Sequence, residues 1–194
     1  MIKVTQEKNN RVCQGDILAN VEYIEKVKEK DGILTVTKIV FPLVVVLSQE
    51  CDLTWDFENR NNQGKGNQDK YLLSIIVAPL YNYEQFINGT HLSELEQQMA
   101  TISSNKKKTD NKMLRDNKNP RYHFLEFDKN IRVVDSVVDF KHYFTVNTTT
   151  LQEMKKDNFV CSISELYRES LSQRFANYLS RIGLPEATTP ESNT

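Results

Sequence analysis

The side chains with the greatest chemical capacity stand together after an apolar run, and they are Ser48, Gln49, Glu50, Cys51 and Asp52. A cysteine acts as a nucleophile when a neighbouring base or cation lowers the pKa of its thiol, because the thiolate is the reactive form. The segment predicts a site with Cys51 and Asp52 as candidate catalytic residues and Ser48 and Gln49 as candidate binding residues. The alternative is that Cys51 is a small half-buried residue and that Asp52 caps the following turn.

A second candidate group surrounds Arg121 and His123, which are separated by one residue. In a strand these two side chains share one face, and Tyr122 and Phe124 share the other. An arginine beside a histidine can clamp an anion, so we place Arg121 among the candidate binding residues and His123 among the candidate catalytic residues. The alternative is a solvated face that alternates with core aromatics.

His123 or His142 would be the base that activates Cys51, whereas His91 beside a Gly-Thr pair is expected in an exposed loop. No HExxH, GxxxxGK[ST] or GxGxxG motif occurs. The three cysteines are an odd number without a CxxC pair, which argues against a disulfide framework and a zinc site. We therefore predict no metal and no cofactor.

A basic stretch begins at Lys106, Lys107 and Lys108 and extends to Arg121. These side chains are candidates for phosphate contacts, but the stretch lacks the interleaved aromatics on which single-stranded nucleic acid stacks. The alternative is a solvated, mobile face.

The composition argues against a membrane-spanning protein and against one that attracts nucleic acid through its overall charge. The 25 basic and 26 acidic side chains give a formal net charge of -1, so no global positive field attracts nucleic acid. The longest apolar runs span about nine residues, against the ~20 that a membrane-spanning helix needs. The first residues carry no apolar core typical of a secretory signal, so we expect a cytoplasmic protein without a membrane segment.

The elements that must position these residues are mainly strands. Lys30–Gly32 is typical of a hairpin turn between strands at Ile17–Lys28 and Ile33–Val40. Leu43–Leu47 is apolar throughout, as expected of a strand buried on both faces. A loop is expected over Glu58–Lys70. Further strands are predicted at Tyr71–Leu80, ended by Pro79, and at Tyr122–Phe127, Ile131–Val138 and Phe140–Val146.

Two helices are predicted. Leu92, Leu95, Met99 and Ile102 are spaced as on one helix face, with Ser93 and Glu96 as a capping box. A second capping box over 162–165 opens a helix that runs to Ile182. The prediction is an α+β fold, mainly β, as a single domain over 1–185 with a helical and basic insertion at about 81–120 and a flexible tail over 186–194.

Several segments resemble PemK/MazF-type toxins: Gly15–Ile17, Pro42–Gln49, Ser74–Pro79 and Phe144–Leu151. The resemblance covers about half of the chain, and it omits the insertion. It implies an SH3-like β-barrel with a terminal helix. It also implies sequence-selective RNA cleavage and a homodimer, as in members of that family.

Cutting RNA without a metal requires a base, an acid and a cation at the phosphate. In such toxins an Arg before the Pro and a Ser or Thr at the end of the next strand commonly serve, but here those positions hold Phe41 and Leu80. The leading hypothesis is therefore a non-catalytic PemK-like binding or interaction subunit of a bacterial or phage toxin-antitoxin or defence system. Its expected partner is an antitoxin-like protein or a defence-complex subunit, with RNA as a further candidate.

Two enzymatic hypotheses stay open. One is a divergent metal-independent endoribonuclease that uses Ser48, Arg121 and His123. The other is a cysteine-dependent enzyme that uses Cys51.

Overall fold

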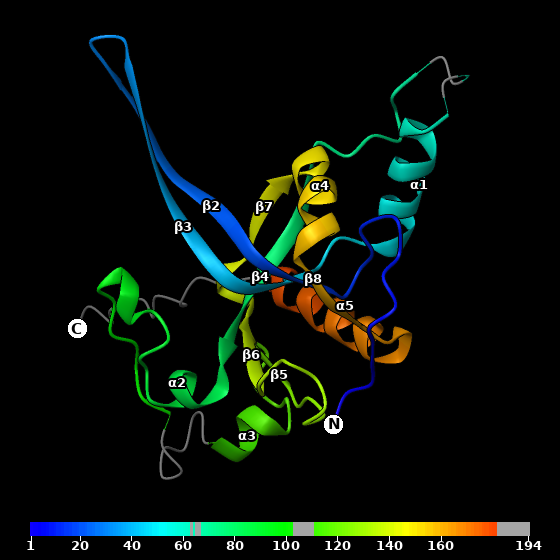
Figure 1. Ribbon diagram of the computed structural model, residues 1–194. Helices are drawn as coiled ribbons and strands as arrows, with labels where there is room; N and C mark the ends of the chain where they lie inside the picture. Colours follow the sequence, from blue (N-terminus) through cyan, green and yellow to red (C-terminus); the bar gives the residue numbers. More distant parts are fainter. Residues whose placement is uncertain (63, 65–66, 103–110, 182–194) are drawn as a thin grey trace, which may run out of the picture.

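The protein is an α+β fold built on a curled antiparallel sheet, seen here in a computed structural model (Figure 1). The structure describes residues 1–62, 64, 67–102 and 111–181. The sheet has the strand order β1-β8-β2-β3-β4-β6-β5, with β7 beside β4. This confirms the prediction of a mainly β protein with helices. Among the described residues no helix is long and apolar enough to cross a membrane.

The longest feature is a hairpin formed by β2 (Asp16–Lys30) and β3 (Ile33–Val46). Its turn is Asp31-Gly32, and both residues have positive φ angles, 53° and 75°, which is the backbone of a two-residue hairpin turn. The predicted hairpin is thus confirmed. The prediction of two separate strands over 33–40 and 43–47 is wrong, because β3 continues through Pro42 into the core.

Strand β4 (Ser74–Asn82) lies at the centre of the sheet. It pairs with β3 along one edge, and with β7 (Phe144–Asn147) and then β6 (Ser136–Asp139) along the other. Pro79 does not end this strand, contrary to prediction. The β7 register stops at Val77 and the β6 register starts at Leu80, so the missing N–H of Pro79 falls in the gap between them.

The remaining strands are short. β5 (Tyr122–Leu125) pairs with β6, and β8 (Phe159–Ile163) joins β2 to β1 (Val4–Thr5). The strands predicted over 131–138 and 140–146 are longer than those observed, because a 3-10 turn, η2 (Phe140–His142), separates β6 from β7.

Helices cover both faces of the curled sheet (Figure 1). α5 (Glu165–Leu179) packs on one face through Leu171 and Phe175, which confirms a C-terminal helix. Its predicted end at Ile182 and the tail predicted over 186–194 lie outside the described residues. The other face is covered by α1 (Glu50–Arg60) and α4 (Thr148–Asn158), which contribute Leu53 and Leu151 to a second cluster. Neither of these two helices was predicted. The capping box expected over 162–165 is absent, since β8 runs to Ile163 and the Ser164 side chain makes no cap bond.

The expected insertion holds only short elements in its described part, namely α2 (Tyr83–Ile87), η1 (Ser93–Leu95) and α3 (Asn111–Arg115). The helix predicted over 92–102 is wrong. Glu96 adopts a left-handed conformation, φ 57°, directly after η1. The chain then turns back, and the Met99 amide donates to the Gly89 carbonyl at 2.9 Å. A Cβ on Gly89 would lie 2.2 Å from the Met99 carbonyl oxygen, so glycine is required there.

Candidate binding groove

The predicted cluster at 48–52 follows the end of β3 and contains the start of α1. The Ser48 hydroxyl accepts from the Ile76 amide at 2.8 Å and so ties β3 to β4. Gln49 is the N-cap of α1, and Cys51 and Asp52 lie in its first turn. Cys51 is exposed, and its thiol lies 3.7 Å from Gln49 Oε1 and 3.7 Å from Asp52 Oδ1.

His123 does not meet Cys51. It is 5% exposed on β5, packs against the Phe140 ring at 6.2 Å between centroids, and has no hydrogen-bond partner for Nδ1. Burial, and secondarily the charge of Arg174, lower the pKa of His123 to about 3. α1 and β5 lie in different parts of the molecule (Figure 1). The structure therefore provides a neutral, buried imidazole away from Cys51, and the carboxylate next to the Cys51 thiol is that of Asp52.

Arg121 is engaged with a buried carboxylate. Its Nε and Nη2 donate to Asp139 at 2.8 and 2.5 Å, a bidentate pair that fixes both groups. The hydrogen bond to Asp139, with its charge, raises the pKa of Arg121 despite burial. Tyr122 and Phe124 pack into a different apolar cluster from the one that His123 faces, as the predicted alternation requires. Arg121 does not share the face of His123, because its guanidinium lies over the Tyr122 ring, 5.0 Å from the centroid, and binds Asp139, the ladder partner of Tyr122. The predicted phosphate contacts Lys106, Lys107 and Lys108 lie outside the described residues.

Glu50, for which no specific role was predicted, organises the start of α1. Its carboxylate accepts from Arg11 Nη2 at 2.5 Å and from the Gln14 amide at 2.7 Å, and it lies 3.5 Å from Arg168 Nη1. These contacts join the N-terminal segment, α1 and α5. The densest polar segment of the sequence is thus a structural junction.

A buried ion pair lies next to this junction. Lys155 on α4 donates to Asp16 Oδ2 at 2.7 Å and also to the Arg11 carbonyl, and the Cys13 amide donates to the same Asp16 oxygen at 2.7 Å. Both charged side chains are 1–2% exposed. Burial raises the pKa of Asp16, although Lys155 and the Cys13 amide act in the opposite direction. The charged groups of both side chains are thus bound to partners within the fold.

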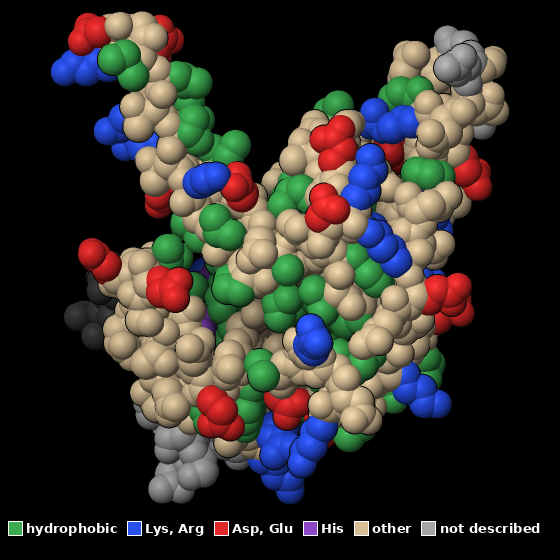
Figure 2. Space-filling view, viewed as in Figure 1, with side chains coloured by type: hydrophobic (Ala, Val, Ile, Leu, Met, Phe, Trp, Pro, Cys, Tyr) green, Lys and Arg blue, Asp and Glu red, His purple; other side chains and the backbone are tan. Residues whose placement is uncertain are grey.

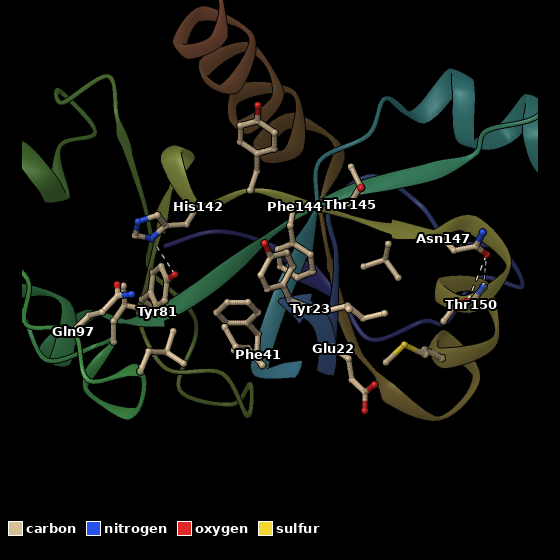
Figure 3. Close-up of a pocket in the computed structure, with 17 residues that line it drawn as sticks. Glu22, Tyr23, Phe41, Tyr81, Gln97, His142, Phe144, Thr145, Asn147 and Thr150 are labelled. Atoms are coloured by element: carbon tan, nitrogen blue, oxygen red, sulfur yellow. Dashed lines mark hydrogen bonds between the residues drawn. The ribbon is translucent and has the colours of Figure 1, made fainter. Parts of the chain in front are cut away.

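A groove of about 820 Å³ lies between the base of the β2–β3 hairpin and β7 (Figure 3). Its aromatic centre consists of Tyr23, Phe41 and Phe144, with ring centroids 5.3 Å apart in both the Tyr23–Phe144 and the Phe41–Phe144 pairs. The other wall is formed by the segment around η1, including Leu92 and Leu95. The groove is thus built from segments far apart in the sequence.

All of β7 lines this groove, and β7 carries no second strand among the described residues. The Ile76 carbonyl accepts from the Leu47 amide, and the Ile76 amide donates to Ser48, so both groups of Ile76 point toward β3. Its partner across the β4–β7 ladder, Thr145, is therefore in a non-hydrogen-bonded pair. The Thr145 amide and carbonyl consequently point away from β4, along the open edge.

One corner of the groove holds a chain of polar contacts. The Tyr81 hydroxyl lies 3.0 Å from His142 Nδ1, and His142 Nε2 lies 3.7 Å from the Asp139 carboxylate that Arg121 binds. Burial, and then the charge of Asp139, raise the pKa of Tyr81. Burial lowers the pKa of His142, although Asp139 opposes this effect. Burial thus favours the protonated hydroxyl of Tyr81 and the neutral imidazole of His142.

A smaller cavity of about 250 Å³ adjoins the groove and shares Tyr81, Leu92 and Phe41 with it. His91 lines it and lies between the Phe86 and Tyr81 rings, at 4.4 and 4.7 Å between centroids. Burial, and then the nearby His142, lower the pKa of His91 to about 4. His91 is therefore a neutral, half-buried ring and not the exposed loop residue that was expected.

The groove lining is almost uncharged. Glu22 is the one ionised side chain among the described lining residues, and Gln97, Thr145, Asn147 and Thr150 supply neutral polar groups. No group of three or more His, Cys, Asp or Glu side chains in the described ranges could hold a metal ion. The open edge of β7 can form hydrogen bonds with the backbone of a ligand, and the aromatic centre can hold apolar side chains.

No family model, curated protein or solved structure matches the chain.

Proposed function

We propose that the protein is a non-catalytic binding subunit that captures an extended segment of a partner protein in this groove. The observation that carries the proposal is the unpaired edge of β7 along the groove. A peptide in extended conformation can add to such an edge as a further strand, with main-chain hydrogen bonds supplying affinity and side-chain pockets supplying specificity. The aromatic centre formed by Tyr23, Phe41 and Phe144 offers such a pocket.

The chemistry of the lining favours a protein segment over RNA. A site for single-stranded nucleic acid combines aromatic platforms with cations along the backbone. The groove has aromatic rings, but its described lining includes no lysine or arginine, and its one charge is the carboxylate of Glu22. Lys38 lies beside this lining, but its ammonium is already paired with Glu22 at 2.5 Å.

The titratable groups support binding rather than catalysis. A catalytic tyrosine or histidine requires a pKa near the working pH. The raised pKa of Tyr81 keeps its hydroxyl protonated, and the pKa of His123 near 3 keeps that ring neutral. Arg121 is neutralised by Asp139. The Asp139 carboxylate links Arg121 with His142 and so with Tyr81, whereas His123 packs against Phe140 outside the groove lining. The described lining therefore holds no activated nucleophile.

The proposed fold is a divergent PemK-like, SH3-like barrel, and the proposed setting is a cytoplasmic toxin-antitoxin or phage-defence system. Support comes from the resembling segments together with the curled antiparallel sheet and the C-terminal helix α5. Phe41, at the position where the toxins commonly carry arginine, lines the groove, and Leu80 is buried. Both residues serve binding or packing.

The test is selection of peptides by the full chain, with paired variants at Thr145. Phage-displayed random peptides are panned on immobilised protein, and the best binder is synthesised and titrated. Thr145→Pro removes the outward amide without removing a β4–β7 hydrogen bond, and Thr145→Ala keeps the amide and removes only the side chain. We expect Thr145→Pro to weaken binding about tenfold, since one hydrogen bond is worth roughly 1.4 kcal/mol, and Thr145→Ala to bind within about twofold.

Equal melting temperatures of the two variants would show that both are folded. Equal affinities of both variants would refute strand addition at β7. Failure to select any peptide, together with retention of a random RNA pool on a filter, would refute the protein-segment proposal and favour the RNA alternative.

A further inference from the structure

The side chains of β7 alternate between the face of the sheet that α1 and α4 cover and the opposite face. Phe144 and Val146 are each 8% exposed and belong to the cluster under α1 and α4, whereas Thr145 and Asn147 are exposed. A strand that adds to β7 at Thr145 continues this pleat, because residues opposite each other in a ladder share a face. The ligand residue opposite Thr145 therefore points outward. Its two neighbours in sequence point inward, toward the cluster, beside Phe144 and Val146.

The two inward positions have different surroundings. Beside Phe144 lie the rings of Tyr23 and Phe41, each with its centroid 5.3 Å from that of Phe144, and Figure 3 shows the three rings together in the middle of the groove. Beside Val146 the lining comes from Met154 on α4, which packs against the same cluster. A large aromatic or aliphatic side chain can pack on the rings at the first position, and an aliphatic side chain can contact the thioether at the second.

The inward positions also differ from the outward one in the charge that they can accept. In the space-filling view hydrophobic side chains gather at the base of the β2–β3 hairpin (Figure 2). Glu22 is the ionised side chain of the described lining, but it neighbours Tyr23 on β2 and so lies on the other face of that strand, where it binds Lys38 at 2.5 Å. A charged side chain buried at an inward position would lose its hydration without gaining a counter-ion.

We infer that the captured segment carries uncharged apolar side chains at two positions separated by one residue, with the larger of them beside Phe144 and a residue of any type opposite Thr145. The inference rests on the proposed capture of a strand at β7, and it names the class of segment that the groove takes. The pattern holds for either strand direction, because the neighbours of the residue opposite Thr145 face inward in parallel and antiparallel ladders alike. The direction decides only whether the larger side chain precedes or follows the outward residue.

The test is a substitution scan of the peptide selected on the full chain, titrated against the wild-type protein. Each peptide residue is replaced in turn by alanine and by aspartate. We expect aspartate to weaken binding at least about thirtyfold at two positions separated by one residue, because the carboxylate is buried there without a partner. Aspartate at the residue between them should leave the affinity within about threefold.

Two protein variants assign the inward positions. Phe41→Leu removes a ring but keeps an apolar side chain, and Met154→Ala shortens the contact from α4. In Phe41→Leu, alanine at the larger peptide side chain should cost less affinity than it does with the wild type, while alanine at the other inward position keeps its full cost; Met154→Ala should show the reverse. The matched control is Glu153→Ala, the exposed neighbour of Met154 outside the groove lining, which should leave the scan unchanged.

The outcomes separate this inference from the proposal on which it rests. A peptide that binds but tolerates aspartate at every position, or whose sensitive positions are adjacent rather than alternate, would overturn the inference alone. The same holds if Phe41→Leu and Met154→Ala alter the cost at the same peptide position or at neither. Failure to select any peptide would refute the capture of a strand, and this inference with it.

Discussion

Asp16 and Asp139 are equally buried, each about 1% exposed, yet their surroundings differ. Asp16 is bound by Lys155, whose side chain is as inaccessible as its own. Asp139 is bound by Arg121, 31% exposed, and faces His142, 22% exposed, which lines the groove. One carboxylate closes a network inside the fold, whereas the other holds residues at a surface hollow.

This difference in surroundings indicates which of the two carboxylate networks a ligand can reach. Isolated buried charges are costly, so both carboxylates need cations for stability. Only the Asp139 network continues, through His142 and Tyr81, to groups that a ligand can contact. We therefore assign the Asp16 network to folding and the Asp139 network to shaping the groove.

The largest effect is expected from breaking the closed network. Lys155→Met leaves the Asp16 carboxylate buried without its cation, and loss of one partner of a buried pair costs about 3–5 kcal/mol. Urea unfolding measures the change. Lys156→Met is the matched control, because Lys156 is the exposed neighbour on the same helix, and its stability should stay near that of the wild type. Equal stability of the Lys155→Met and Lys156→Met variants would contradict the assignment of the Asp16 network to folding.

A smaller effect is expected at the open network. Arg121→Ala removes the bidentate partner of Asp139, but Arg121 is partly exposed and water can enter its place. We expect a loss of about 1–3 kcal/mol, the cost of an unsatisfied buried acceptor. Urea unfolding of Arg121→Ala and Lys155→Met under the same conditions compares their losses of unfolding free energy. A larger loss for Arg121→Ala would contradict the comparison between the two carboxylates.

The smallest effect concerns protonation of His142. Its folded-state pKa lies below the ordinary value because of burial, and Asp139 opposes that shift. A depressed histidine pKa contributes stability above about pH 6.5, and this contribution is lost as the pH falls through the folded pKa. Asp139→Asn should lower the pKa of His142 further, as followed by NMR titration of the ring. A pKa of His142 that rises in this variant would contradict the proposed contact.

Local signals in the sequence predicted the hairpin and the C-terminal helix. The Lys30–Gly32 turn and the apolar stripe of α5 are each set by neighbouring residues. α4 was not predicted, because Thr148, Thr149 and Thr150 favour strands, whereas the Asn147 side chain caps the helix by accepting from the Thr150 amide. In this segment strand pairing up to Asn147 and the helix cap outweighed the intrinsic strand propensity of the threonines.

The groove could not be predicted from the sequence. The open edge of β7 depends on which edge of β4 pairs with β3, and residues 144–147 carry no signal of that choice. The Tyr81–His142 contact likewise joins residues 61 positions apart. The cluster at 48–52 misled the prediction, because side chains that bind the fold together are of the same types as those that perform chemistry.

The most direct test of strand addition at β7 is amide hydrogen exchange at Thr145, in the free protein and with a peptide selected on the full chain. The account predicts rapid exchange at Thr145 in the free protein, protection when the peptide is bound, and protection of Phe144 and Val146 in both states because their amides pair with β4. Protection of Thr145 in the free protein, or its continued rapid exchange in the complex, would contradict the proposed role of β7.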